Sequence, residues 1–427
     1  MDIITDDRNA LRRLAERVAE IAALPIQAER QELWRRLNQL DSVRPMVHIY
    51  QIPWRELQMT DPDPLALVCQ DPFCRQIEGE LTRLTYQWER FPGDMVVEPV
   101  FRMEPVLIGD NYGIGIEETT IAQRGGDRVE SGISSHAYVP QITEEADVEK
   151  IKIPQITVDQ AATDARTALL NDVFGDLLEV RVAVSVGRMN IAPWDRLVHW
   201  TGVTEILTDL ALRPAYVHAI MERLTQAHEA RLNSFRDLGL LRPNNVGVII
   251  GQGGLGYTDE LPGTGYDPED VQFHNLWGGG MAQVFSEVSP AMHREFALAY
   301  EARCLRPFGL LYYGCCEPLH LKVDLIREML PQVRKISMSP MADPEIGTAA
   351  MGSSLVYSSK PNPSYLATED WRPDMVEAEL RPILELARDR GCHVEFILKD
   401  ISTVRCEPER LNRWSELVTG LAQEYAR

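Results

Sequence analysis

The feature that most constrains the fold of this chain is a regular alternation of apolar runs and amphipathic segments in its C-terminal part. Apolar runs of strand length occupy residues 310–313, 333–340, 354–363 and 393–400, and helical patterns occupy residues 321–330, 372–390 and 408–425. Short apolar runs bounded by glycine, proline or polar residues are typical of buried parallel strands. Strands that alternate with helices pair in parallel through right-handed crossovers. With about six such units along the chain, we predict an α/β protein with a closed (β/α)8 TIM barrel rather than an open sheet.

Two segments depart from this alternation. Residues 1–43 have apolar positions at helical spacing among many charged residues, which predicts a helical N-terminal extension. This extension could cover the barrel or form the contact of a homodimer. The barrel itself is predicted over residues 44–427. Within it, residues 107–150 are rich in turn-forming and strand-forming residues, and we interpret them as a β-rich insertion rather than a separate domain.

The composition limits the partners and the compartment that we expect. The chain has 427 residues and a formal net charge of −21. A nucleic-acid-binding protein needs a basic face to neutralise phosphates, so we expect no nucleic-acid partner. No apolar run approaches the roughly 20 residues that cross a bilayer, and the charged N-terminus does not resemble a signal peptide. We therefore expect a cytoplasmic protein that makes no membrane contact, with its seven cysteines unpaired.

The strongest candidate for a functional site is the end of the apolar run in LLYYGCCEPLH, residues 310–320. Cys315, Cys316 and Glu317 follow the predicted strand directly. They would therefore lie at its C-terminal end, where α/β barrels place their chemistry. Two soft sulfur ligands and a carboxylate within three residues are the beginning of a zinc site, although not a complete one.

Other polar residues follow or surround the remaining predicted strands. As candidate catalytic groups we select Glu317, His274, Lys360 and Asp400. Lys360 is placed to meet an anionic or carbonyl group of a substrate, or it is simply a solvated lysine. Asp400 could act on a substrate or form an ion pair with its neighbour Lys399.

Residues expected to contact a substrate are polar or aromatic and lie close to predicted strand ends. They are His48, Gln51, Trp194, Tyr257, Trp277 and Ser402. His48 stands between two apolar residues, which is also typical of a buried core histidine, and the aromatic residues could equally pack under the loops. The glycine-rich segment after residue 250 permits either a close approach of the backbone to a ligand or a flexible lid.

Three segments of the sequence carry a resemblance to a known family. SEVSPAMHREF at 286–296, followed by GLLYYGCCEPLH at 309–320, resembles the uroporphyrinogen decarboxylase superfamily. This superfamily includes methylcobamide-dependent methyltransferases and is related to cobalamin-independent methionine synthase. Residues 201–239 are similar to the helix pair that precedes a central strand in the family. The resemblance covers residues 44–425 and implies a divergent member with the TIM barrel of the family.

The chain departs from the family pattern at two places. The decarboxylase binds the carboxylates of its substrate with an arginine-rich loop; Arg44 and Pro45 match the start of that loop, but QIPW at 51–54 replaces its continuation. Decarboxylation of uroporphyrinogen is therefore not expected. The methyltransferases bind zinc through a His-x-Cys pair and a later cysteine, whereas Tyr313 or Gly314 stands at the histidine position here.

The resemblance nevertheless implies a zinc site with a modified set of ligands. Its members would be Cys316, Glu317 and Cys406, with Cys315 or His274 as a further ligand. Cys392 is the other downstream cysteine, but it would begin the last strand and so lie at the wrong end of the barrel. The competing interpretation is that the cysteines pack beside a pocket that binds an organic ligand without metal.

The leading hypothesis from the sequence is a methyltransferase that moves a methyl group between a corrinoid and a small molecule, with zinc or the cysteines activating the nucleophile. Because no Asp-x-His-x-x-Gly motif occurs, the corrinoid would be carried by a separate partner protein. The first alternative is a metal-free decarboxylase or lyase that acts on a small organic acid through Lys360, Asp400 and His274. The second is a non-catalytic barrel that binds a small molecule.

Overall fold

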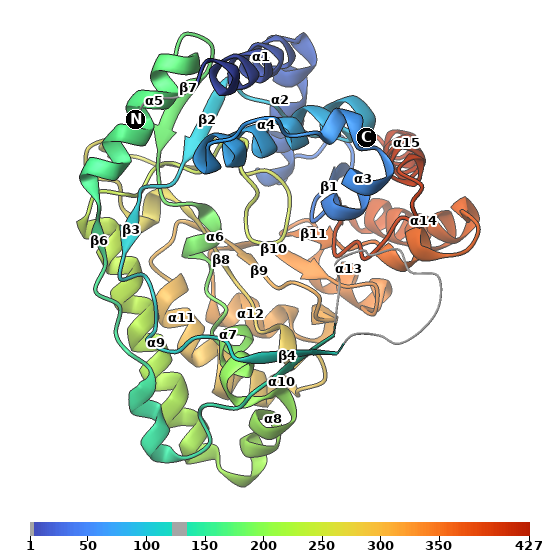
Figure 1. The fold of residues 1–427 in the computed structure, drawn as a ribbon. Coiled ribbons are helices and arrows are strands. Elements are labelled where there is room, and N and C mark those ends of the chain that lie inside the picture. The colour runs from blue at the N-terminus through green and yellow to red at the C-terminus, as the bar shows by residue number, and fades with distance from the viewer. Residues whose placement is uncertain (1–3, 122–134) are drawn as a thin grey trace.

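The computed structural model of the chain describes residues 4–121 and 135–427. Its centre is a sheet of six parallel strands in the order β1-β12-β11-β10-β9-β8 (Figure 1). These strands are β1 (Met46–Ile49), β8 (Trp277–Gly280), β9 (Leu310–Tyr313), β10 (Val333–Met338), β11 (Val356–Ser359) and β12 (His393–Leu398). Because every pairing in this sheet is parallel, the carboxyl ends of all six strands lie at the same edge.

The remaining strands form three separate pairs. They are β2 (Val100–Met103), β3 (Leu107–Ile108), β4 (Glu118–Ile121), β5 (Ser135–Tyr138), β6 (Thr157–Val158) and β7 (Glu179–Val182). The pair β2–β7 is parallel, whereas β3–β6 and β4–β5 are antiparallel. Residues 122–134 of the predicted β-rich insertion lie outside the described residues. The predicted parallel α/β architecture is confirmed, but among the described strands the two parallel sheets share no hydrogen bonds and no closed barrel forms.

Helices surround the sheet and connect its strands. They are α1 (Thr5–Ala22), α2 (Pro25–Asn38), α3 (Trp54–Thr60), α4 (Pro72–Arg90), α5 (Gln160–Phe174), α6 (Val186–Met189), α7 (Pro193–Thr201), α8 (Val203–Leu212), α9 (Pro214–Asp237), α10 (Pro290–His293), α11 (Ala299–Leu305), α12 (Val323–Met329), α13 (Pro344–Met351), α14 (Pro373–Arg390) and α15 (Glu409–Glu424). Helices α12 to α15 pack against β10, β11, β12 and β1 respectively (Figure 1). Within the described chain, none of the helices combines the length and the apolar character that crossing a membrane requires.

Of the predicted N-terminal extension, the described residues 4–43 contain the two helices α1 and α2. Helix α1 packs against α4 and α5, and α2 contacts β1. From α2, Asn38 donates hydrogen bonds to the carbonyl oxygens of Leu255 (2.9 Å) and Tyr257 (2.7 Å). Helix α2 therefore holds the glycine-rich segment that follows Ile250.

The glycine-rich segment lies against the interior face of the sheet. On β9, Tyr312 packs with Ile250 on this face, whereas Leu311 and Tyr313 belong to the core under the helices. A Cβ atom added at Gly253 would lie 2.3 Å from the ring of Tyr312, and one at Gly254 would lie 2.2 Å from the ring of Trp34. Only glycine fits such distances, so these glycines allow the backbone to approach the protein's own aromatic rings.

Candidate functional site

Four polar residues meet at the carboxyl edge of the central sheet. Cys315 and Cys316 follow β9, and Lys399 and Asp400 follow β12. These strands are separated by β10 and β11 in the sheet, so the meeting depends on the curvature of the sheet. Gly314 makes the turn that directs the cysteines: its φ is +100°, and a Cβ there would lie 2.4 Å from Leu319.

The ammonium group of Lys399 is the centre of this cluster. Its Nζ donates to the sulfur of Cys315 (3.2 Å), to the sulfur of Cys316 (3.2 Å) and to the carboxylate of Asp400 (2.6 Å). The two sulfurs are 3.5 Å apart, and the thiol of Cys316 donates to Asp400 at 3.0 Å. Lys399 and Cys315 are buried, whereas Cys316 is half-buried. A buried ammonium in contact with two sulfurs stabilises a negative charge on them.

The two thiols hold their protons unequally. The pKa of Cys315 lies below its ordinary value because of its hydrogen bond with Cys316 and because Lys399 attracts the thiolate, and together these outweigh burial. The same hydrogen bond, together with burial, raises the pKa of Cys316. Burial opposes the charge of Lys399, but the neighbouring sulfurs outweigh burial and raise its pKa. The cluster therefore favours one thiolate, one thiol and one ammonium.

A second lysine lies buried next to this cluster. Lys360 follows β11, and its Nζ lies 2.7 Å from the hydroxyl of Tyr312 and 2.7 Å from the hydroxyl of Ser358. Burial lowers the pKa of Lys360 to about 7; Glu395 opposes this change and Lys399 adds to it. A large share of Lys360 is therefore an uncharged amine at neutral pH, which is the nucleophilic form of lysine.

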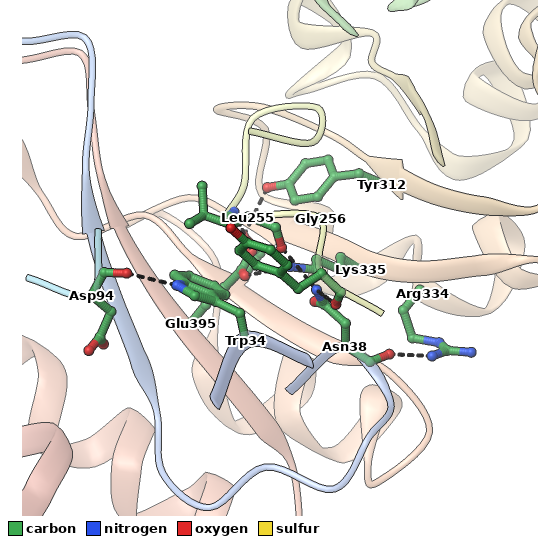
Figure 2. Close-up of polar contacts among 12 residues, drawn as sticks. Trp34, Asn38, Asp94, Leu255, Gly256, Tyr312, Arg334, Lys335 and Glu395 are labelled. Atoms are coloured by element: carbon green, nitrogen blue, oxygen red, sulfur yellow. Dashed lines mark hydrogen bonds and ion pairs between the residues drawn. The ribbon is translucent and has the colours of Figure 1, made fainter. Parts of the chain in front are cut away.

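An ion pair supports Lys360 from within the sheet. The carboxylate of Glu395 on β12 accepts hydrogen bonds from Lys335 (2.8 Å) and from the hydroxyl of Ser358 (2.6 Å). The side chains of Lys335 and Glu395 are fully buried, and Figure 2 shows them beside Trp34 and Tyr312. The pKa of Lys335 is lowered by burial, while that of Glu395 is lowered because its lysine neighbours outweigh burial. The pair fixes Ser358, which in turn positions the amine of Lys360.

The end of β1 and the glycine-rich segment complete the site. The hydroxyl of Tyr50 donates to Gln252 at 2.5 Å, and the backbone N–H of Asp400 donates to the side chain of Gln51 at 3.2 Å. Burial raises the pKa of Tyr50, while the nearby charge of Lys399 opposes the change. Gln252 thus brings the glycine-rich segment to the residues around the cysteines.

The structure brings together only part of the predicted catalytic set. Asp400 lies in the cluster described above, and Lys360 lies next to that cluster. Glu317 is fully buried and turns its carboxylate to the backbone N–H groups of Cys315 (2.6 Å) and Ala282 (3.3 Å), and burial raises its pKa. His274 is exposed and precedes β8. It therefore lies at the amino end of that strand, opposite the edge where the cysteines lie.

Most of the residues that were predicted to contact a substrate lie outside this site. Their side chains are buried in the core. Gln51 belongs to the site, and Ser402 is exposed in the loop after β12. His48 is buried within β1, where burial lowers its pKa to about 4. The three aromatic residues are buried and their polar atoms are bound: Trp194 donates to the carbonyl of Phe296 (2.8 Å), Tyr257 to Glu98 (2.7 Å) and Trp277 to the carbonyl of Gly256 (2.9 Å).

The sequence interpretation missed several residues of the site. Lys399 was expected at a strand end beside Asp400 but was not selected as a site residue, and Tyr312, Ser358 and Glu395 were not selected either. The available signal was the alternation of side chains along β9, β11 and β12, because every second residue of a strand faces the same side. Tyr312, Ser358 and Glu395 all occupy such positions on the interior face.

The predicted zinc ligands are not assembled into one site. In residues 4–121 and 135–427, no group of three or more histidine, cysteine, aspartate or glutamate side chains is placed to hold a metal ion. Glu317 faces the backbone, and Cys406 is exposed, with its N–H donating to Glu56 at 2.7 Å. Lys399 already places a cation against Cys315 and Cys316. This arrangement does not fit a zinc ion, and the zinc site stays a prediction.

Comparisons with known proteins do not identify a family. No family model matches the sequence, and no curated protein sequence matches it. Among solved structures, a methyltransferase from Methanosarcina mazei is similar at 12% sequence identity and a TM-score of 0.47, over 90% of this chain and 96% of that chain. At this level of similarity, membership of the uroporphyrinogen decarboxylase superfamily stays a prediction.

Proposed function

We propose that this chain is a methyl-transfer enzyme in which the thiolate shared by Cys315 and Cys316 receives the methyl group. The observation that carries the proposal is the contact of the Lys399 ammonium with both sulfurs at 3.2 Å. A thiolate is the reactive form of cysteine, and a cationic neighbour increases its population at neutral pH. Thiolate sulfur is a soft nucleophile, which suits attack on a saturated methyl carbon.

In the proposed step, the thiolate of Cys315 attacks the methyl carbon of a small donor. A sulfur–carbon bond forms, the bond from carbon to the leaving atom breaks, and its electron pair stays on the leaving atom, which takes a proton from water. In the second half, a second nucleophile takes the methyl group and the thiolate departs. Lys399 stabilises the thiolate at both stages, because the same sulfur carries the charge before attack and after departure.

The neighbouring residues have supporting roles in this proposal. Asp400 binds both Lys399 and the thiol of Cys316, so it orients the ammonium between the sulfurs. Cys316 lies beside the sulfur of Cys315 and is the more exposed of the two, so substrate approaches from its side. As the second nucleophile we propose a corrinoid carried on a separate protein, which is a substrate of this chain and not its resident cofactor.

The test runs the second half-reaction in reverse, with methylcobalamin that carries an isotopically labelled methyl group as the donor probe. After incubation with the full chain, peptide mass spectrometry is expected to find the label on Cys315 or Cys316. Cys315→Ser and Lys399→Met are expected to lose most of the label. Cys406→Ser is the matched control, because Cys406 is an exposed thiol that does not contact Lys399. Methyl transfer at the wild-type rate in a Cys315→Ser, Cys316→Ser double variant would contradict the proposal.

A second candidate function is supported by the uncharged amine of Lys360. A lysine with a pKa of about 7 can attack the carbonyl carbon of an oxo acid, with loss of water, to form an imine. Decarboxylation would then break the bond to the carboxylate carbon, and the electron pair would move into the imine before a proton is added. Tyr312 and Ser358 hold the amine, and Lys399 would attract the carboxylate of the acid. This is the metal-free decarboxylase or lyase alternative.

Trapping with borohydride distinguishes the two candidates. With acetoacetate as the probe, the lyase candidate predicts a reduced adduct on the peptide that contains Lys360. Lys322 is the internal control, because burial lowers its pKa to about 8 while its Nζ is bound to the carbonyl of Phe285, away from the cysteines. Trapping is expected to increase as the pH rises through 7. An adduct on Lys322 and none on Lys360 would rule out this candidate.

A further inference from the structure

A cavity lies beside the parallel strand pair β2–β7, which in the described chain is not hydrogen-bonded to the central sheet. A cavity of about 270 Å³ lies between the ends of β2 and β7 and the chain segment 242–249. Cys315, Cys316, Lys360 and Lys399 do not line it, so it is separate from the site described above.

Apolar side chains form most of the walls of this cavity. They come from β2, from the segment after β7 and from the chain that precedes the glycine-rich segment: Met103, Val184, Met189, Val248 and Ile249. An apolar cavity of ~150 Å³ holds benzene, so a volume of about 270 Å³ has room for a somewhat larger organic body. Apolar walls favour a ligand with an apolar body, because the entry of such a ligand removes apolar surface from water.

The rim of the cavity carries an excess of positive charge. Three arginines line it, and two of them have carboxylate partners: Arg102 pairs with Glu98, and Arg181 pairs with Glu179 at 2.8 Å. Within the described residues, the third, Arg242, donates only to the carbonyl oxygens of Gly239 (2.8 Å) and Leu241 (2.6 Å).

The acidic residue of the lining does not neutralise Arg242. The carboxylate of Glu104 accepts a hydrogen bond from Arg188 at 2.7 Å and another from the backbone N–H of Ser185 at 3.3 Å. Arg242 therefore presents a guanidinium at the rim whose described partners carry no formal charge. Guanidinium groups bind carboxylates through paired, charge-assisted hydrogen bonds.

We propose that this cavity is a second binding site that takes a small carboxylate with an aromatic or branched apolar body of about ten non-hydrogen atoms. The carboxylate binds Arg242 at the rim. The apolar body lies against Val184, Val248 and Ile249. Tight binding needs both halves of the ligand. The apolar walls bind only the apolar body, and the exposed guanidinium of Arg242 binds only the carboxylate.

The test measures binding of benzoate, phenylacetate and isovalerate to the full chain by calorimetry, with the matching amides as neutral probes. At least one acid is expected to bind with one-to-one stoichiometry and its amide about tenfold more weakly. Arg242→Gln is expected to weaken the acid about tenfold and to leave the amide unchanged. Arg236→Gln is the matched control, because Arg236 pairs with Asp237 and does not line the cavity.

A second variant tests the apolar half of the site independently. Ala183→Phe places a ring in the cavity and is expected to abolish binding of both the acid and the amide, while the thermal unfolding of the variant shows that it is folded. The proposal is overturned if no acid shows saturable binding up to about 10 mM. It is also overturned if Arg242→Gln binds the acid as tightly as the wild type, or if folded Ala183→Phe binds unchanged.

Discussion

Replacing Lys399 by methionine removes the ammonium from the cysteine pair while it keeps a side chain of similar length in a buried position. Lys399 donates to Cys315 and to Cys316. Its removal leaves the carboxylate of Asp400 beside the thiols without a cation. We therefore expect the pKa of the reactive thiol to rise and the thiol to react more slowly with an electrophile at neutral pH.

The size of this change follows from the distances. Two unit charges separated by 3.2 Å interact by about 5 kcal/mol at an effective dielectric constant of ~20. Asp400 lies 2.6 Å from the same ammonium, is half exposed and cancels part of this interaction. If about half of this interaction energy remains, its loss in Lys399→Met raises the thiol pKa by about two units, since one pKa unit corresponds to 1.36 kcal/mol. Below both pKa values the thiolate population then falls about a hundredfold.

The reaction rate falls by less than the thiolate population. A more basic thiolate is intrinsically more nucleophilic, with a Brønsted coefficient of about 0.4–0.5, which restores close to tenfold for two units. Alkylation of the cysteine pair by iodoacetamide is therefore expected to be about tenfold slower in Lys399→Met at neutral pH. Asp400→Asn is expected to act in the opposite direction, because it removes the carboxylate that accepts from Cys316.

The assay is a pH–rate profile of alkylation, resolved by peptide mass spectrometry. Cys406 is exposed and serves as the reference thiol in every sample. The profile of the peptide with Cys315 and Cys316 should shift to higher pH in Lys399→Met, while the profile of Cys406 stays in place. An unchanged profile for the cysteine pair, in a variant that circular dichroism shows to be folded, would refute the assigned role of Lys399.

Three further predictions concern stability. Glu395→Gln leaves buried Lys335 without its partner, and urea denaturation should show a loss of about 3–5 kcal/mol; an unchanged midpoint would contradict the ion pair. Gly253→Ala puts a methyl group 2.3 Å from the nearest ring and should cost at least about 1–3 kcal/mol, whereas Gly420→Ala, in open space within α15, should stabilise by up to ~1 kcal/mol. Burial raises the pKa of Glu301 from 4.5 to about 8, so the folded chain keeps a proton that the unfolded chain loses. The free energy of unfolding should fall as the pH rises through this interval, and Glu301→Gln should remove that part of the pH dependence.

The strand positions near the C-terminus were predictable because the apolar runs there are bounded by clear turn residues. The predicted strands at 333–340, 354–363 and 393–400 contain β10, β11 and β12. This was enough to place Cys315, Cys316 and Asp400 at one edge of the sheet. The contact of Lys399 with both sulfurs was not predictable, because β9 and β12 are not neighbours in the sheet and their approach depends on its curvature.

Two further differences have local physical causes. Strand β8 has the sequence WGGG, and glycine has a low strand propensity, so the start of this strand was not visible and His274 was selected as a candidate although it precedes the strand. The glycine-rich segment could be interpreted as a lid because its partners are distant in sequence. Tyr312, which requires glycine at 253, comes from β9, and Trp34, which requires glycine at 254, comes from α2.

The charges around the cysteines explain why a lysine and a zinc ion are alternatives at this place. A zinc ion bound by both sulfurs would take two thiolates, whereas one ammonium supports one thiolate and leaves Cys316 as a thiol that donates to Asp400. A zinc ion would also have to displace Lys399 from its contacts with both sulfurs at 3.2 Å and leave its charge buried nearby. Cys316, Cys315 and Lys399 therefore form a consistent set: a half-buried thiol, a thiolate and a fixed internal cation that can stabilise sulfur as either nucleophile or leaving group.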